Sequence, residues 1–411
     1  MKTNKESKHI YKIAFLVSIS CVLQIAESLI PHPIPGLRLG LSNVITLIAL
    51  VTMGFGYALE ITILRTLLSS FIVGTFMSPT FVLSFSAGLM STVSMGFFYW
   101  LGRRQRYLRL SIVGISIVGA LTHNIMQLYL AYFLLIKHPG VFIFFPWLCI
   151  GAVVMGLVTG VSSASVCLRL KEKGSQELFA GYLCANSPSL LFRQYLPGDS
   201  FIHHLRPQVK IATIFILSVA VLIFNSVWLY SGLCIFLLLA MIISKTSFSF
   251  VFQGLRRYSS MIVVAFLFPL LFNQGKHILS PIAYFNITAE GLAAGSAFAW
   301  RLSFLISASL LLARTTSPKE LGHGVAHMLY PFRAFGISQE RTAAILSLSW
   351  MGVPVLWEIA KNNLRSIDFK NAKTFRNLLP ILCDFIVIFY LQTEQIAMLW
   401  EEEHLRSQVS T

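Results

Sequence analysis

Acidic residues are scarce in this chain of 411 residues, which has 16 aspartates and glutamates against 32 lysines and arginines. The three aspartates, Asp199, Asp368 and Asp384, are far apart, so no D-D-x-x-D cluster is present to hold the Mg²⁺ of a prenyl diphosphate synthase. No G-x-x-x-x-G-K-[ST] motif occurs, because "NQGKHI" at 273–278 lacks the upstream glycine and the final Ser or Thr. The sequence therefore predicts neither prenyl transfer nor ATP hydrolysis by this chain.

Charge of both signs is also sparse. Charged residues make up 12% of the chain, against about 25% in an ordinary soluble domain, and hydrophobic residues make up 56%. The excess of positive charge falls in short segments between apolar runs, as in membrane proteins that follow the positive-inside rule. This distribution argues against nucleic acid as a partner. The six cysteines form no C-x-x-C pair, and we interpret them as small packing residues.

The apolar runs predict an all-α polytopic membrane protein. A spanning helix needs about 20 apolar residues, because the hydrocarbon core is about 30 Å thick. A first unit, residues 10–170, holds six such candidates: 10–30, 41–58, 61–78, 80–101, 110–135 and 141–168. After a polar linker at 171–208, a second unit at 209–313 holds four more: 209–225, 227–244, 259–274 and 292–313.

Residues 314–405 have a different pattern, in which charged and apolar residues alternate. We expect amphipathic helices here, between 317 and 400, that lie along or below the cytosolic face of the membrane. Only 378–391 is apolar enough to enter the bilayer, and Asp384 within it argues against a simple span.

The stretch "AESLIPHPIPGLRLGLSN" at 26–43 carries polar residues between two apolar runs. Its prolines stiffen the connection, because proline denies the chain helical hydrogen bonds. Glu27 and Arg38 either bind polar groups of a solute at the outer surface or form an ion pair at the headgroups. Asn43 is a further candidate for solute binding.

Other polar residues lie within predicted spans. His123, Asn124 and Gln127 in the fifth span face either a cavity or a neighbouring helix, to which they would donate hydrogen bonds. Arg65 in the third span is interpreted as extending its guanidinium to the cytosolic surface.

The first span carries a row of small residues. Ala14, Ser18 and Ala26 recur at a four-residue spacing that is broken by Val22. Small residues let another helix approach closely, either within the six-span unit or from the second unit.

Two family resemblances follow from these motifs. The segments 27–50, 64–95 and "HNIMQL" at 123–128 resemble the Gx transporter, or heptaprenyl diphosphate synthase component I, family. That family is similar to the substrate-binding S components of energy-coupling factor (ECF) vitamin transporters, which implies a six-helix solute-binding bundle. The S components use a small-residue face of their first helix against the T component.

The region 311–369 resembles the CbiQ-like T component of the same transporters. The resemblance implies that Leu364, Arg365 and Ser366 form the Arg-centred motif that docks on the ATPases. A second such motif is expected near the C-terminus, where 401–403 are three glutamates and only Arg406 remains as a substitute.

Together the resemblances imply a non-enzymatic permease with fused S and T components in a bacterial-type cytoplasmic membrane. Its partners would be cytosolic ABC ATPase subunits, the lipid bilayer and a small solute such as a vitamin or cofactor precursor. The chain itself would hold no cofactor or metal, since ATP is hydrolysed by the partner subunits. Two alternatives stay open: a non-catalytic membrane subunit of prenyl diphosphate or quinone synthesis, and a membrane scaffold for an extracytosolic flavin or redox system.

The alternation of charge predicts the orientation of the chain. The basic segments 103–109 and 169–173 fall on the side of the Lys-rich N-terminus, which is therefore predicted to be cytosolic. An impermeant thiol reagent should label cysteines placed at positions 34 and 139 from outside intact cells, and not one placed at 185. Strong external labelling at 185 would contradict this two-unit topology.

Overall fold

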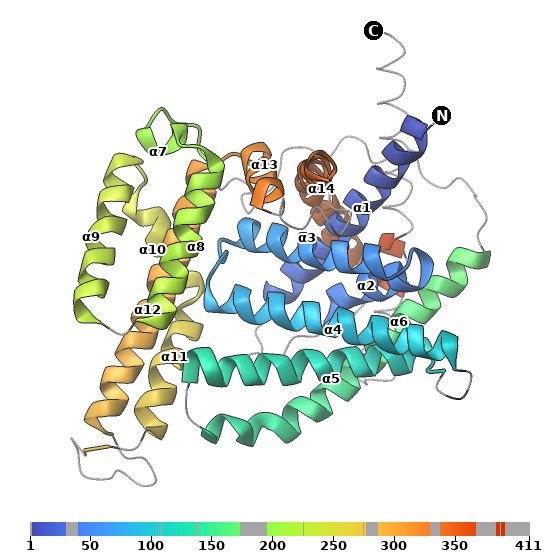
Figure 1. The fold of residues 1–411 in the computed structure, drawn as a ribbon, viewed down its shortest axis with the longest axis horizontal. Helices are drawn as coiled ribbons and strands as arrows, with labels where there is room; N and C mark the ends of the chain where they lie inside the picture. Colours follow the sequence, from blue (N-terminus) through green and yellow to red (C-terminus); the bar gives the residue numbers. More distant parts are fainter. Residues whose placement is uncertain are drawn as a thin grey trace.

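The computed structural model describes residues 2–29, 40–105, 107, 109–136, 139–172, 195–224, 226–273, 275–276, 287–328, 338–366, 384–386 and 388–390. Within these ranges the elements are helices, and no strand is formed. This confirms the predicted all-α fold class. The helices form two groups in Figure 1, with α1–α6 on one side, α8–α12 on the other, and α13 and α14 near the top between them.

The first group covers the residues for which the sequence predicted a six-helix unit. Its helices are α1 (Lys2–Leu29), α2 (Leu41–Thr52), α3 (Phe55–Val73), α4 (Pro79–Arg104), α5 (Ile112–Ala131) and α6 (Phe145–Glu172). A π-helical turn (Tyr132–Ile136) extends α5, and a 3-10 turn (Pro139–Phe144) precedes α6.

The sequence fixes where several of these helices begin and end. Ser78 and Ser111 cap α4 and α5, where their side-chain oxygens accept hydrogen bonds from the N–H groups of Phe81 and Gly114. Gly74 ends α3 in the left-handed conformation, with φ of 77°, which glycine adopts without steric cost.

The second group contains α7 (Phe201–His204), α8 (Pro207–Ile223), α9 (Val227–Ile243), α10 (Phe248–Arg257), α11 (Ser259–Phe272) and α12 (Ala289–Thr315). In Figure 1, α13 (Pro318–Met328) and α14 (Gln339–Ser366) lie between the two groups. Helix α13 packs on both α8 and α14, and α14 packs along α1 of the first group. The last turn of α12 is tied to α8, because Lys210 Nζ donates to the carbonyl oxygen of Thr315 at 3.0 Å. The domain boundaries drawn from the sequence stay predictions.

Seven described helices are long and apolar enough to cross a membrane, or eight if α10 and α11, bent by 57°, form one span. The apolar helices α2, α8 and α9 are 12, 17 and 17 residues long, so they fall below the 18 residues required of a candidate span. Helix α14 meets the criterion between Gln339 and Asn363, in a region where we expected surface helices. Its charged residues lie near its ends, so they conceal the apolar middle when the sequence is read as a whole.

Helices α1 and α14 pack through hydroxyl groups and backbone. Ser18 Oγ lies 2.8 Å from the carbonyl oxygen of Ala14 and 3.1 Å from that of Ser349. Ser349 Oγ donates in turn to the Ala14 oxygen at 2.9 Å. A Cβ atom on Gly352 would lie only 2.9 Å from Ser18 Oγ. Of the three small residues singled out in the first span, Ala14 and Ser18 therefore contact α14, while Ala26 lies half-buried further along α1.

Glycines bring α5 and α6 into backbone contact. A Cβ atom on Gly156 would lie 2.7 Å from Cα of Ile117, and one on Gly160 would lie 2.7 Å from Cα of Val113. Beside them, Ser116 and Thr159 are joined by a 2.7 Å hydrogen bond between their hydroxyls.

This packing predicts the effect of a single added methyl group. Gly156→Ala should lower the free energy of unfolding by about 1–3 kcal/mol, because the new Cβ meets backbone that cannot rotate away. Gly232→Ala on α9, where no atom lies within 4 Å, is the matched control and should not destabilise the protein. Thermal unfolding of the purified protein in detergent measures both. Equal melting temperatures for the two variants would contradict the close α5–α6 contact.

Candidate functional site

A small cavity lies between α4, α5, α6 and the start of α2. Its volume is about 20 Å³, enough for roughly one water molecule. Three of the predicted solute-binding residues line it: Asn43, His123 and Asn124. The other lining residues are Gly40, Ser91, Met95, Ser116, Ala120, Ala152, Met155 and Thr159. Gln127, also predicted, is buried but does not line the cavity.

Several polar groups of the lining are engaged between helices. Asn124 Nδ2 on α5 donates to the carbonyl oxygen of Leu148 on α6 at 2.9 Å. Ser116 bonds to Thr159, as described above. Asn124 thus does both things that the sequence left open, since it bonds to a neighbouring helix and also lines the cavity.

Ser91 differs from its neighbours. Its side chain is 1% exposed, and its hydroxyl has no hydrogen-bond partner among the described residues. A buried hydroxyl without a partner costs free energy, so this site favours a water molecule or a polar group of a ligand beside Ser91.

The start of α2 forms one wall of the cavity and is held by Glu27. The Gly40 N–H donates to Glu27 Oε1 at 2.6 Å, and the Glu27 side chain is 3% exposed. Gly40 caps α2 with φ of 73°, a left-handed conformation suited to glycine. Glu27 is therefore buried, and the expectation that it lies at the water interface is wrong. Arg38, its expected partner, lies outside the described residues.

Arg65 holds the same wall from α3. Its Nη2 donates to Asn43 Oδ1 at 2.7 Å, and the residue is only 3% exposed. The interpretation that Arg65 extends to the cytosolic surface is thus wrong, because an amide acceptor on α2 is within its reach. Gly88 on α4 faces the guanidinium, and a Cβ there would lie at an ordinary contact distance of 3.8 Å from Nη2.

Ser91, Ser116 and Thr159 also line the cavity and were not predicted from the sequence. A helical repeat of cavity positions marks two of these helices: Ser116, Ala120 and His123 on α5, and Ala152, Met155 and Thr159 on α6. Each set recurs at three or four residues, which places it on one face. Small and polar residues at this spacing in an apolar span were the signal that could have identified the lining.

The predicted docking motif, Leu364, Arg365 and Ser366, forms the C-terminal end of α14. The side chains of these three residues, Arg406 and the glutamates at 401–403 lie outside the part of the chain that the structure describes. The described ranges contain no group of three or more His, Cys, Asp or Glu residues placed to hold a metal ion. The roles assigned to the site residues stay predictions.

Comparison with known proteins divides the chain into two parts. Residues 16–166 match the family described as heptaprenyl diphosphate synthase component I, and residues 198–398 match the family described as cobalt transport protein, CbiQ. Both matches confirm the resemblances inferred from the sequence.

Curated relatives match about half of the chain. It is similar to the "Energy-coupling factor transporter transmembrane protein EcfT" of Clostridium kluyveri, with 30% identity over 217 residues, which cover 51% of this chain and 80% of the relative. The protein of the same name from Thermosediminibacter oceani is 30% identical over 221 residues, covering 52% of this chain and 83% of the relative. That of Bacillus subtilis is 28% identical over 221 residues, with the same two coverages.

Two serines on the cavity wall should respond differently to the loss of their hydroxyls. Ser91→Ala should leave the free energy of unfolding unchanged or raise it, because an unsatisfied buried hydroxyl costs about 1–3 kcal/mol. Ser116→Ala should lower it by about 0.5–1.5 kcal/mol, because its bond to Thr159 is lost. Thermal unfolding of both variants in the same detergent decides the matter. Destabilisation by Ser91→Ala as large as that by Ser116→Ala would show that Ser91 is satisfied within the protein.

Proposed function

We propose that this chain, which belongs to the family of ECF transporter transmembrane (T) proteins, is a permease in which a solute-binding unit and a T unit are fused. The proteins of that family are transport subunits and not enzymes. Its six-helix unit would bind a small solute, and its second unit would couple solute release to ATP hydrolysis in separate cytosolic ABC subunits. No cofactor is required on this chain for that role.

The observation that supports this proposal is the contact between the two units. Helix α14, from the part that matches the T family, packs on α1 of the six-helix unit through Ser349 and Ser18. In the same helix, Leu364–Arg365–Ser366 is proposed as the docking site for the ATPases. A displacement of α14 by those subunits would therefore reach the solute-binding unit directly.

The cavity at the start of α2 is the proposed solute site. Asn43, His123 and Asn124 would contact the solute, with Ser91 as an added donor or acceptor. Glu27 would act by holding Gly40 in place, and Arg38 and Gln127 are kept as proposed contacts. The cavity is too small for a vitamin as it stands, so solute entry would require the lining helices to separate.

The lining also supports a solute class. Apart from His123, the lining residues carry no ionisable side chain, and the nearby charges of Glu27 and Arg65 are each bound to the start of α2. Such a lining suits a small uncharged solute with several hydrogen-bonding groups, as many cofactor precursors have.

A second function is favoured by one finding, the description of the family that matches residues 16–166. It suggests a non-catalytic membrane subunit associated with prenyl diphosphate synthesis. The proteins that co-purify with the chain distinguish the two functions. ATPases with a P-loop motif would support transport, whereas a soluble prenyltransferase would support the second function.

Loss of the docking arginine tests the proposed coupling. Arg365→Ala should reduce complex formation with the ATPases by more than about tenfold, because removing one partner of a buried charged hydrogen bond costs about 2–5 kcal/mol. Arg406→Ala should do much less. Mass spectrometry of small molecules retained by the purified protein should give the same compounds for both variants and the parent chain. Normal ATPase binding by Arg365→Ala would contradict the assigned docking role.

A further inference from the structure

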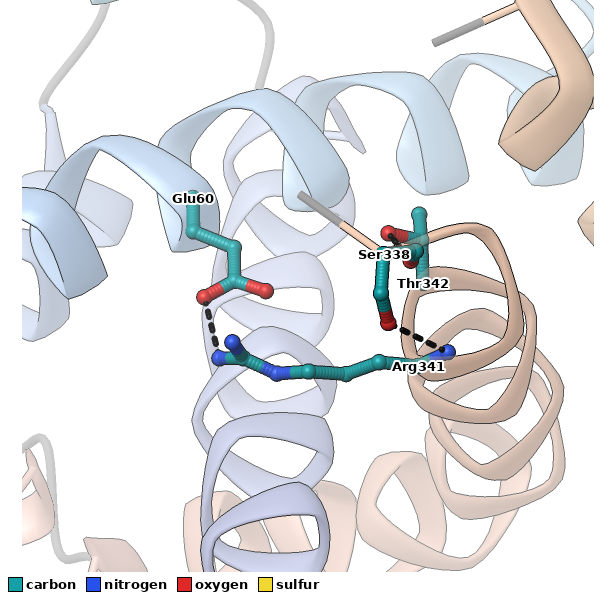
Figure 2. Close-up of polar contacts among 4 residues, drawn as sticks. All are labelled: Glu60, Ser338, Arg341 and Thr342. Carbon is teal, nitrogen blue, oxygen red and sulfur yellow. Dashed lines mark hydrogen bonds and ion pairs between the residues drawn. The ribbon is translucent and has the colours of Figure 1, made fainter. Parts of the chain in front are cut away.

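Helix α14 contacts the six-helix unit in two places of different chemistry. Along α1 the contact is made by small residues and hydroxyls, as described for Ser18 and Ser349. At the first turn of α14 the contact is an ion pair, in which Arg341 Nη2 lies 2.8 Å from Glu60 Oε2 of α3. Figure 2 shows the arginine side chain extended across the gap between the two helices to reach the carboxylate.

The ion pair is sheltered and has aromatic neighbours. The Glu60 side chain is 15% exposed and that of Arg341 is 30% exposed. The guanidinium carbon of Arg341 lies 5.8 Å from the centre of the Tyr57 ring, which stacks on His9 of α1 at 6.1 Å. One arginine of α14 thus meets groups of α3 that are themselves packed on α1.

The helix itself does not explain a cation at this position. Ser338 caps α14, since its Oγ accepts from the Arg341 N–H at 3.2 Å and its carbonyl oxygen accepts from Thr342 Oγ1 at 2.9 Å (Figure 2). A positive charge in the first turn of a helix interacts unfavourably with the helix dipole, whereas the negative charge of the neighbouring Glu340 interacts favourably with it. The partner that favours Arg341 here is Glu60.

We propose that the Glu60–Arg341 pair sets the register of α14 on the six-helix unit, with Arg341 as its positioning residue. The small residues of α1 by themselves select a register weakly, because Ala14 and Ser18 lie one turn apart, although Val22 interrupts the spacing before Ala26. A slip of one helical turn, about 5.4 Å, that brings Ala14 into the place of Ser18 would keep a small residue against α14. It would break the 2.8 Å ion pair as well as the hydrogen bonds between Ser18, Ser349 and Ala14.

The register matters because α14 also carries the proposed docking motif. Arg341 and Arg365 are 24 residues apart, which corresponds to about 36 Å along a helix. Fixing one end of α14 on α3 therefore fixes where its other end meets a partner. This consequence rests on the proposed function, whereas the register itself does not.

An engineered disulfide reports the register directly. An ideal Cβ on Gly352 lies 3.5 Å from Cβ of Ser18, a separation that a disulfide accepts. We would combine Ser18→Cys and Gly352→Cys in a full-length chain from which the six native cysteines have been removed. The rate of disulfide formation under a mild oxidant is then measured in detergent, without solute, nucleotide or ATPases.

Reversal of one charge should misplace α14, and reversal of both should restore it. Glu60→Arg or Arg341→Glu alone should slow cross-linking at least about fivefold, because like charges then face each other. The combination of the two should return the rate to within about twofold of the parent, because the attraction is restored. Arg341→Gln, which removes the charge without repulsion, should give an intermediate rate.

The control is an ion pair on the same helix that does not join the units. Glu358 and Lys361 lie 3.8 Å apart on α14, and reversing either charge should leave the cross-linking rate unchanged. Unchanged rates in the single Glu60 and Arg341 variants, or failure of the double reversal to recover, would overturn the proposal. Melting temperatures identify any variant that has lost its fold. If a charge-reversal variant has lost its fold, the cross-linking rate of Arg341→Gln decides whether the ion pair sets the register. A chain that passes this test but moves no solute would refute the proposed function alone.

Discussion

The hydrogen-bonded contact between Ser18 of α1 and Ser349 of α14 joins the two halves of this protein. Helix α1 also ends at the cavity, where Glu27 accepts a hydrogen bond from the N–H of Gly40, thirteen residues further along the chain. One helix therefore connects the T-family part to the wall of the proposed solute site. Because an α-helix is stiff over this length, a movement of α14 and the position of the start of α2 are mechanically linked through α1.

Two buried charges shape the cavity without entering its lining. Isolated charges within a membrane protein are costly, so Glu27 and Arg65 must bind polar groups. Both do so at the start of α2, Glu27 at Gly40 and Arg65 at the Asn43 side chain. The result is a fixed helix end and a wall whose remaining polar groups are neutral, which is the basis for proposing an uncharged solute.

The sequence was sufficient for the fold class, most of the spans of the six-helix unit and both family resemblances, because apolar length and motif residues are local properties. It also singled out Asn43, His123 and Asn124, which line the cavity, since polar residues in an apolar span must face protein or a cavity. It failed where the partner is distant. Arg65 binds an acceptor on another helix, and Arg341 pairs with Glu60 across 281 residues of sequence. The periodicity of a sequence predicts which face of a helix is buried, but it does not predict which helix packs against that face. The span-length apolar part of α14 was missed because charges at both ends obscured it.

The central claim is that a solute-binding unit and its coupling unit act together in one chain. ATP-driven uptake into proteoliposomes that contain this chain and its co-purified ATPases tests it most directly. The compounds that mass spectrometry finds on the purified protein are supplied outside the vesicles. We predict that one of them accumulates inside only when ATP is present on the ATPase side. Retention of a compound by the protein without any ATP-dependent accumulation would contradict the account.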